Sequence, residues 1–458
     1  MKNYTFPISK SNKMYIEIYE HIKNDILKGV LEKDEKLPSK RVLAKNLNVS
    51  LNTIVNAYDI LLLEGYIYSK EKMGYYVSDF FGFDYKDKIN DNIVEEVKKE
   101  DYLYDFTTSN IDYSLFPKSV FNQITKDIIY NDETFYNRFD YKGSINLRNQ
   151  IKKLLYEEKS INVYSDQIII GENAHSLINE VIKLLNVNSI MIENPGYYNK
   201  KSFNINVLYN YMDIKGFSTK EFASTNIKLA IVTSFLQFPT GLIMPMDRKL
   251  EISNYIKDND KYIIEDSFDS SFRNNGYQTV PLFNLSDNVI FLGSFSRTMF
   301  PGLCISYMVL PKKLVSKYEE IFSVSPKSIP SLDQIILTKF IESGKYSNHI
   351  NRLRTSFLNK KKLILNKISN KLKITSTNNY SSILVDVSEI IDIEKLKNEF
   401  KKRKIKIYFI NDFMEKKVKN EILIIGFSSI DYSLIDKGID LIIDSINCSL
   451  KWNNKMIK

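Results

Sequence analysis

The sequence predicts an α/β protein in which a small N-terminal helical unit precedes a much larger region with a mainly parallel sheet. Three observations predict this class. The chain of 458 residues exceeds the roughly 250–300 residues at which one hydrophobic core stops growing. Residues 14–79 combine three amphipathic segments with two short alternating ones. From residue 105 onward, short apolar segments alternate with longer helical segments, which is typical of an α/β fold.

The composition excludes several classes of protein. With 43% hydrophobic and 26% charged residues, it is that of a soluble globular chain. Its longest apolar runs, such as residues 54–63, fall far short of the roughly 20 residues that span a bilayer. The N-terminus lacks the apolar core of a secretory signal, and two cysteines, Cys304 and Cys448, give neither a disulfide framework nor a metal cluster. We therefore expect a cytoplasmic protein with no membrane partner and no metal site.

Three helices and a hairpin are predicted in the N-terminal unit. The first helix has apolar residues at helical spacing and Gly29 as its stop; these residues are Tyr15, Ile18, Tyr19, Ile22 and Ile26. Ser39 is a candidate N-cap for the second helix and Ser50 for the third, which Gly65 ends. Two alternating strands surround a turn at Lys72–Gly74. This order predicts a winged helix-turn-helix, a unit that places its last helix in the major groove of DNA.

Such a unit contacts DNA through the starts of its second and third helices and through its wing. The candidate DNA-binding residues are Ser39, Lys40, Arg41, Ser50, Asn52, Thr53, Lys70, Lys72 and Gly74. Charge does not decide the matter, because the chain carries a net charge of +9 while residues 1–80 hold twelve Lys and Arg against ten Asp and Glu. A small helical domain that packs on another protein stays open on charge alone.

The stretch from Met14 to Val77 resembles the DNA-binding domain of the GntR family of bacterial regulators. The resemblance includes nearly every residue at which a helix or strand begins or ends, as in "LPSKRVLAKNLNVSLNTIVNAYDILLLEGY". The resemblance implies a double-stranded DNA operator as partner, with Arg41 as a phosphate contact. That family commonly has arginine directly after the serine that opens the recognition helix, whereas this sequence has Leu51. One base contact of the family is therefore not carried over.

A charged segment without clear periodicity separates the two parts of the chain. We expect a DNA-binding domain over residues 1–79, a linker over residues 80–104 and one large domain over residues 105–458. Strands predicted in the large domain are Gln167–Ile170, Ser189–Ile192, Leu229–Val232, Tyr262–Ile264 and Asn288–Phe291. In a mainly parallel sheet the ligand site lies beyond the carboxyl ends of the strands.

Several loops after these strands resemble fold-type I aminotransferases. The whole chain resembles a MocR-type regulator, in which a GntR domain is joined to an aminotransferase-like domain. The supporting stretches include "FDYKGSINLRNQI", "IENPGYYNKK", "QFPTGLIMP", "YIIEDSFDSSF" and "GSFSRTMFPGLCISYMVLP". The resemblance implies a smaller C-terminal α/β subdomain and pyridoxal 5′-phosphate as the family's cofactor. Because a regulator of this kind reads two half-sites, we also expect a homodimer and a repeated operator.

The resemblance places the family's cofactor residues on positions of this sequence. The candidate cofactor-binding residues are His175, Gln237, Asp266, Phe268, Ser294, Ser296 and Arg297. Asp266 matches the acidic residue that pairs with the pyridine nitrogen, although such a residue can also cap a loop after a strand. Phe268 stands where the family often has tyrosine. Ser294 and Ser296 match hydroxyls that contact the phosphate, and serines at a strand end are also ordinary turn formers.

The basic groups of the family's site are altered. Arg297 stands where the family has the lysine of the Schiff base, and a guanidinium, with a pKa above about 12, stays protonated and cannot attack an aldehyde. Cys304 replaces the usual phosphate-binding arginine, and Glu172 lies near the place of the phosphate dianion. No arginine follows Arg403 to grip a substrate carboxylate. We therefore expect no catalytic residues and no covalent cofactor.

Three functions stay open. The first is a transcription regulator whose large domain dimerises and senses a small ligand. The second is a regulator whose large domain is a ligand-free scaffold that spaces two DNA-binding heads. The third, an active aminotransferase tethered to DNA, is disfavoured because proton transfer at the substrate α-carbon also normally uses the missing lysine.

Overall fold

The computed structural model describes residues 6, 14–79, 102–108, 111–267, 279–324, 329–388 and 392–450. The chain divides into two compact units, Met1–Glu100 and Asp101–Lys458, and each is considered by itself. Phe268 and most of the predicted linker over residues 80–104 lie outside the described residues.

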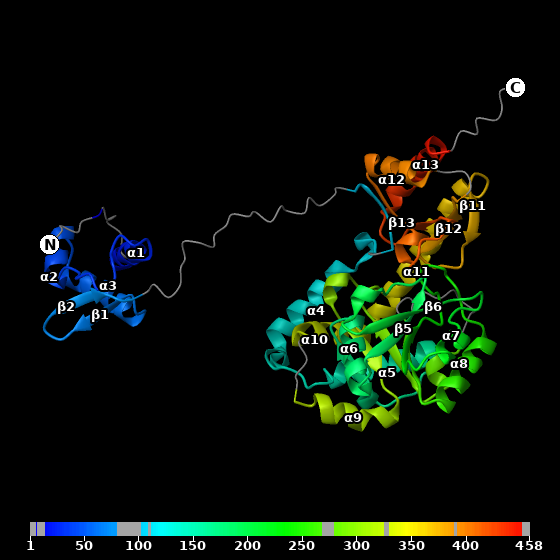
Figure 1. Ribbon diagram of the computed structural model, residues 1–458, viewed down its shortest axis with the longest axis horizontal. Coiled ribbons are helices and arrows are strands. Elements are labelled where there is room, and N and C mark those ends of the chain that lie inside the picture. The colour runs from blue at the N-terminus through cyan, green and yellow to red at the C-terminus, as the bar shows by residue number, and fades with distance from the viewer. Residues whose placement is uncertain are drawn as a thin grey trace. The chain divides into compact units, whose positions relative to one another are not determined.

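The N-terminal unit consists of three helices followed by a two-stranded sheet (Figure 1). Its elements are α1 (Met14–Leu27), α2 (Lys40–Leu47), α3 (Leu51–Leu63), β1 (Ile67–Lys70) and β2 (Gly74–Val77). Ile22, Ile54 and Tyr58 are completely buried where the apolar faces of α1 and α3 meet. This element order is the predicted winged helix-turn-helix.

Local sequence sets the ends of these elements. Ser39 Oγ accepts a hydrogen bond from the Val42 amide at 3.3 Å, and it thereby caps α2. Gly65 follows α3 with a φ of +78°, a conformation that glycine adopts without strain. β1 and β2 pair antiparallel around the predicted turn, with Ile67 opposite Val77.

A seven-stranded sheet forms the centre of the large unit, in the order β4-β10-β9-β8-β7-β5-β6. Its strands are β4 (Ile168–Gly171), β5 (Ser189–Asn194), β6 (Asn206–Tyr211), β7 (Leu229–Val232), β8 (Tyr262–Asp266), β9 (Val289–Ser294) and β10 (Ser306–Val309). The strands from β6 to β9 in that order pair in parallel, whereas β10 runs antiparallel to β4 and β9. The mainly parallel sheet is confirmed, and β5, β8 and β9 extend beyond their predicted carboxyl ends.

Both faces of this sheet are buried. Ile168 and Ile170 pack into one core, whereas Ile169, between them, packs into another. The helices of this part are α4 (Lys118–Asn131), α5 (Ile145–Lys159), α6 (Ala174–Leu185), α7 (Thr219–Ala223), α8 (Met246–Asp258), α9 (Lys312–Phe322) and α10 (Ser331–Glu342). α5 supplies the first core and α6 and α9 the second.

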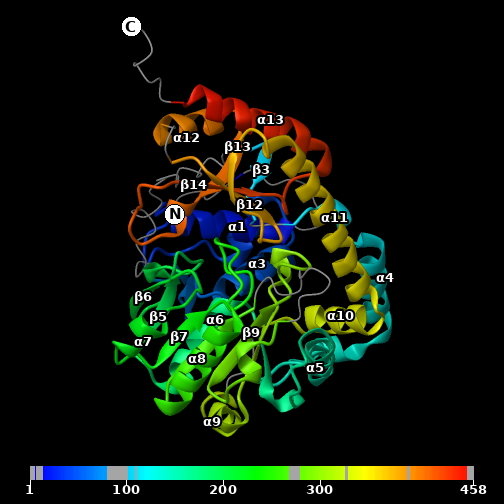
Figure 2. The same ribbon diagram turned by 90° about the vertical axis from the view of Figure 1, so that its right-hand side faces the viewer.

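A smaller sheet forms the C-terminal subdomain, in the order β11-β12-β14-β13-β3. Its strands are β3 (Tyr104–Phe106), β11 (Lys373–Ser376), β12 (Ser382–Asp386), β13 (Ile405–Phe409) and β14 (Ile422–Gly426), and its helices are α12 (Ile393–Lys402) and α13 (Tyr432–Cys448). The long helix α11 (Lys345–Ile368) packs against α10 and α13 and so joins the two subdomains (Figure 2). Among the helices described, none combines the length and apolar character that crossing a bilayer requires.

Candidate ligand cavity and nucleic-acid interface

The predicted DNA-binding residues lie at the starts of α2 and α3 and on the β1–β2 wing. Ser50 Oγ accepts from the Thr53 amide at 3.2 Å and lies 2.7 Å from Thr53 Oγ1, so these hydroxyls are engaged within the first turn of α3. Arg41 and Asn52 are exposed at their helix starts. In a helix-turn-helix, these helix starts are the parts that face DNA.

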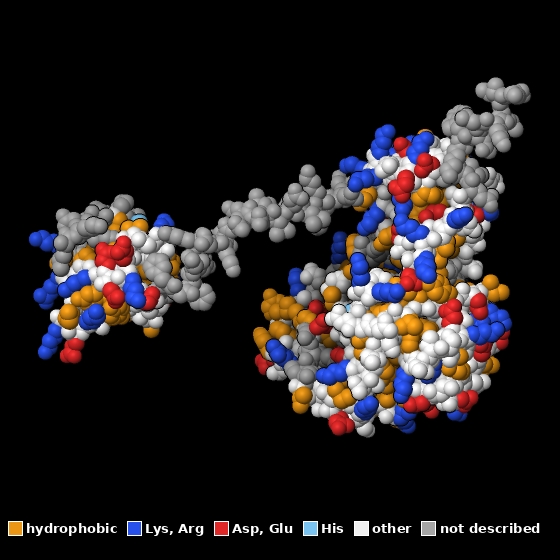
Figure 3. All heavy atoms as spheres, viewed as in Figure 1, with side chains coloured by type: hydrophobic (Ala, Val, Ile, Leu, Met, Phe, Trp, Pro, Cys, Tyr) orange, Lys and Arg blue, Asp and Glu red, His pale blue; other side chains and the backbone are white. Residues whose placement is uncertain are grey.

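The basic side chains of this surface differ in their freedom. Lys40 pairs with Asp59 at 3.0 Å, and its ammonium lies 5.0 Å from the centre of the Tyr75 ring. Lys70 lies over the Tyr76 ring of the neighbouring strand at 4.6 Å. Basic and acidic side chains are interspersed on the visible face of this unit (Figure 3). Residues 1–80 hold twelve Lys and Arg against ten Asp and Glu, so this part of the chain has no large excess of positive charge.

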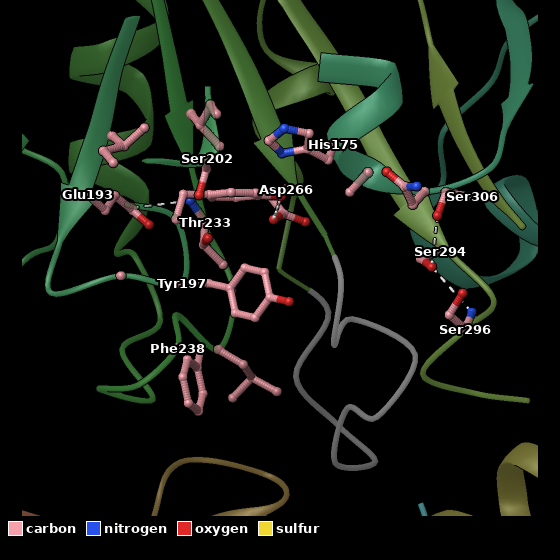
Figure 4. Close-up of a pocket in the computed structure, with 17 residues that line it drawn as sticks. His175, Glu193, Tyr197, Ser202, Thr233, Phe238, Asp266, Ser294, Ser296 and Ser306 are labelled. Carbon is pink, nitrogen blue, oxygen red and sulfur yellow. Dashed lines mark hydrogen bonds between the residues drawn. The ribbon is translucent and has the colours of Figure 1, made fainter. Parts of the chain in front are cut away.

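A cavity of about 490 Å³ opens beyond the carboxyl ends of β5, β7, β8 and β9, where a parallel sheet binds its ligands. Figure 4 shows Ser294, Ser296 and Ser306 grouped at one side of the view and Glu193 at the other, with Asp266 and His175 between them. The lining consists of Asn173, Ala174, His175, Ile192, Glu193, Gly196, Tyr197, Tyr198, Ser202, Ile231, Thr233, Leu236, Phe238, Asp266, Ser294, Ser296 and Ser306. Its volume suits a small organic ligand.

Two carboxyl groups lie in the wall of this cavity. The Tyr198 hydroxyl donates to Asp266 Oδ2 at 2.9 Å, and burial together with that carboxylate raises the pKa of Tyr198, so it remains a donor. Glu193 Oε1 accepts from the Thr233 amide at 3.1 Å. Burial raises the pKa of Glu193 to about 8, and the charge of Asp266 adds to this effect. Glu193 therefore holds its proton at neutral pH.

The opposite end of the cavity presents hydrogen-bond donors. The Ser306 hydroxyl lies 3.0 Å from Ser294 Oγ, which also accepts from the Ser296 amide at 3.2 Å. α6 begins at the same end, capped by Asn173, whose Oδ1 accepts from an amide of the first turn at 2.8 Å. His175 follows in that turn. A helix N-terminus beside hydroxyls and an imidazole suits an anionic group.

Four positions singled out in the sequence do not line the cavity: Glu172, Gln237, Arg297 and Cys304. Arg297 is buried directly after Ser296, and Cys304 is exposed with a φ of +49°. Gln237 lies behind the wall, where its Nε2 donates to the Pro195 carbonyl at 2.8 Å. The sheet thus brings His175, Asp266, Ser294 and Ser296 together and leaves Gln237 and Arg297 out.

Sequence reasoning missed several lining residues. Glu193, Tyr197 and Tyr198 lie in "IENPGYYNKK", a stretch that carried the family resemblance. Their signal was the end of a strand in a parallel sheet, where lining residues are expected. Ser306 was not predicted because β10 runs antiparallel, so its first residue rather than its last one lines the site.

The lining distinguishes two ways of holding pyridoxal phosphate. Among the described residues, neither a lysine nor an arginine lines the cavity, so covalent attachment through a lysine does not fit the described wall. Non-covalent binding fits it, because Asp266 can accept from a ring nitrogen and the serine end can donate to a phosphate.

Two solved structures similar to this chain are aminotransferases. An archaeal alanine:glyoxylate aminotransferase matches with a TM-score of 0.67 and 17% identity, over 75% of this chain and 90% of that one. A kynurenine aminotransferase from Pyrococcus horikoshii matches with a TM-score of 0.66 and 19% identity, over 78% and 93% of the two chains. At these identities the likeness shows the fold, which is the predicted aminotransferase-like fold of type I.

Sequence relatives are regulators. Residues 14–77 match the family described as "Bacterial regulatory proteins, gntR family". The "Uncharacterized HTH-type transcriptional regulator YdeL" of Bacillus subtilis is 30% identical over 445 residues, which cover 93% of this chain and 95% of the relative. The "Probable rhizopine catabolism regulatory protein MocR" of Rhizobium meliloti is 24% identical over 77% of this chain and 76% of its own length. The chain therefore belongs to the MocR-type regulators, and it is a GntR-family DNA-binding transcription regulator with an aminotransferase-like domain rather than an enzyme.

Proposed function

We propose that the large unit binds a small ligand without a covalent bond, pairs two copies of the chain and so controls binding of the N-terminal unit to a repeated DNA operator. The cavity carries this proposal. It has a carboxylate at Asp266, hydroxyl groups at Ser294 and Ser296 that can donate to a ligand, and no lysine among its described lining residues. Such a site suits a small ligand that carries a hydrogen-bond donor on one side and an anionic group on the other.

Pyridoxal phosphate is the proposed ligand, and when bound it supplies a protonated ring nitrogen and a phosphate. Asp266 would accept from the ring nitrogen. Ser294, Ser296 and the first amides of α6 would hold the phosphate. The residues of this chain thereby bind and orient the ligand, and they catalyse no reaction on it.

Pairing of two copies is supported by an apolar patch over α4 and the adjoining turn Glu133–Tyr136. Ile129, Tyr130 and Tyr136 have exposed fractions of 49%, 82% and 77%. Figure 3 shows hydrophobic side chains gathered at the edge of the large unit where α4 lies. Patches of this kind mark interaction surfaces. The double variant Tyr130→Lys/Tyr136→Lys should sediment as a monomer, and an unchanged dimer would place the interface elsewhere.

The ligand claim is tested by heating the full-length protein with pyridoxal phosphate. We expect a saturable rise in Tm that follows RT ln(1 + [L]/Kd) and that is lost in Asp266→Asn. Cys304→Ser, outside the lining, should keep the shift. After borohydride treatment, the mass spectrum should show no stoichiometric adduct; such an adduct would refute non-covalent binding.

The scaffold alternative makes the opposite prediction for the same measurement. If neither pyridoxal phosphate nor any of the common amino acids changes the Tm of the wild-type protein, the large unit spaces the two DNA-binding units without a ligand.

The proposed division of the chain is 1–79 for DNA binding, 80–104 as linker and 105–458 for ligand binding and dimerisation, in a cytoplasmic protein.

A further inference from the structure

The exposed start of α3 carries two side chains that are free to meet base edges. Leu51 and Asn52 are the first two residues of the helix, and Leu51 has an exposed fraction of 43%. In a helix-turn-helix the N-terminal residues of this helix contact bases in the major groove. Leu51 and Asn52 therefore occupy the positions from which sequence is read.

The neighbouring side chains of the first turn are committed elsewhere. Ser50 and Thr53 are bound to one another, and Ile54 is completely buried in the core of the unit. One turn further on, Val55 and Asn56 follow Leu51 and Asn52 at a spacing of four residues. The outward face of α3 thus begins with one apolar row and one amide row.

α3 has no side chain of the kind that recognises guanine. Its sequence, LNTIVNAYDILLL, contains no lysine or arginine, and its one charged residue, Asp59, pairs with Lys40 of α2. Arginine and lysine are the usual partners of guanine O6 and N7. Asparagine binds adenine N6 and N7, and apolar side chains contact the 5-methyl group of thymine.

We propose that Leu51 and Asn52 read A·T base pairs, so that α3 selects an A·T step in each operator half-site. Leu51 packs on the 5-methyl group of a thymine. The Asn52 amide donates to N7 and accepts from the N6 amino group of a neighbouring adenine. The inference rests on DNA binding by the N-terminal unit and adds to it the base pairs that α3 recognises.

The experiment starts with duplexes selected from a random pool by the full-length wild-type protein. Each thymine of the selected site is then replaced in turn by deoxyuridine, which removes only the 5-methyl group. We expect binding to weaken about fourfold at one position of each half-site, as for one buried methyl group. Asn52→Ala should weaken binding roughly tenfold and relax the preference for adenine beside that position.

Variants of α3 decide whether Leu51 causes the effect. Leu51→Ala should bind thymine and deoxyuridine duplexes equally well. Leu63→Ala, at the far end of α3 with an exposed fraction of 88%, should keep the wild-type difference. Because Leu51 and Leu63 are both exposed, the two variants should fold alike, which melting curves check.

Three results overturn the proposal. They are a site without A·T pairs in the groove that α3 enters, a wild-type protein indifferent to every deoxyuridine, and a methyl effect that persists in Leu51→Ala. Failure to select any duplex would count against DNA reading by the N-terminal unit as a whole, so the two failures are distinguishable.

Discussion

The DNA-binding surface and the ligand cavity each contain a helix start that is capped by a side chain, but the residues around the two caps come from very different distances in the sequence. At the DNA surface, Ser50 caps α3 beside residues that follow it immediately. At the cavity, Asn173 caps α6, but Asp266 and Ser306, which also line it, follow 93 and 133 residues later in the sequence and come from strands β8 and β10. The first site is built from neighbouring elements within residues 39–74, whereas the second exists only when strands far apart in the sequence have paired into one sheet.

The largest effect is expected from a variant that removes a buried charge from the large unit. Lys360 is completely buried on α11, where its ammonium lies 2.9 Å from Asp112 Oδ2 and 2.5 Å from the Ile430 carbonyl. Asp112→Ala leaves this ammonium without its carboxylate and should lower the free energy of unfolding by about 3–5 kcal/mol. Calorimetry should show a lower Tm for the large unit and an unchanged transition for the N-terminal unit.

The double variant Asp112→Ala/Lys360→Met provides the control. Removing both charges should restore part of the lost stability, because no uncompensated ammonium remains, whereas the Ser114 amide and the Ile430 carbonyl still lose their partners. If the transitions of both units fell together in Asp112→Ala, the two units would not be energetically independent, and the comparison between them would fail.

A smaller effect depends on pH and belongs to the cavity. The folded protein holds the Glu193 proton up to about pH 8, whereas the unfolded chain releases it near the ordinary pKa of 4.5. Between these values the folded state binds more protons, so stability falls as pH rises, by an amount on the order of 2–4 kcal/mol. Glu193→Gln should flatten this fall in urea unfolding at pH 5 and pH 8.5.

Glu172→Gln is the matched control, since Glu172 is a carboxylate of the same region that does not line the cavity. It should keep the wild-type dependence on pH. An equal flattening in both variants would show that Glu193 is not the titrating group.

These two sites also show what the sequence could predict. Ser39 and Ser50 were identified from the sequence because an N-cap acts on amides two or three residues away. Asp266 and Ser294 were placed at strand ends, and the topology of a parallel sheet brings such ends together. That Arg297 lies outside the cavity lining could not be predicted, because spacing does not say whether the buried side chain after Ser296 lines a cavity.

A third test, at the DNA surface, removes the exposed guanidinium of Arg41. Arg41→Ala should weaken binding roughly tenfold across all duplexes and reduce the slope of log K against log salt by about one, as expected for a lost phosphate contact. The rise in Tm with pyridoxal phosphate should stay as in the wild type. Lys33→Ala is the control, because Lys33 already pairs with Asp79. An unchanged salt slope in Arg41→Ala would remove Arg41 from the contacts.

The smallest effects are expected from two variants that remove the caps of α3 and α6, and they allow a direct comparison of the two sites. Ser50→Ala and Asn173→Ala each remove one side-chain acceptor from a helix start, and each should cost its own unit about 1 kcal/mol. Ser50→Ala should lower the first transition and weaken DNA binding, because Leu51 and Asn52 are presented by that turn. Asn173→Ala should lower the second transition and reduce the ligand-induced rise in Tm.

Measuring both the Tm and the binding of each variant decides whether a cap contributes to ligand or DNA binding or only stabilises its helix. If a cap stabilises only its helix, its removal lowers the Tm of the unit but leaves the affinity of the folded unit for DNA or pyridoxal phosphate unchanged. If Asn173→Ala keeps the full response to pyridoxal phosphate, the start of α6 does not hold the phosphate. Anion binding would then depend on the hydroxyls of Ser294 and Ser296 alone. Such neutral donors hold a dianion less tightly than donors backed by a helix dipole.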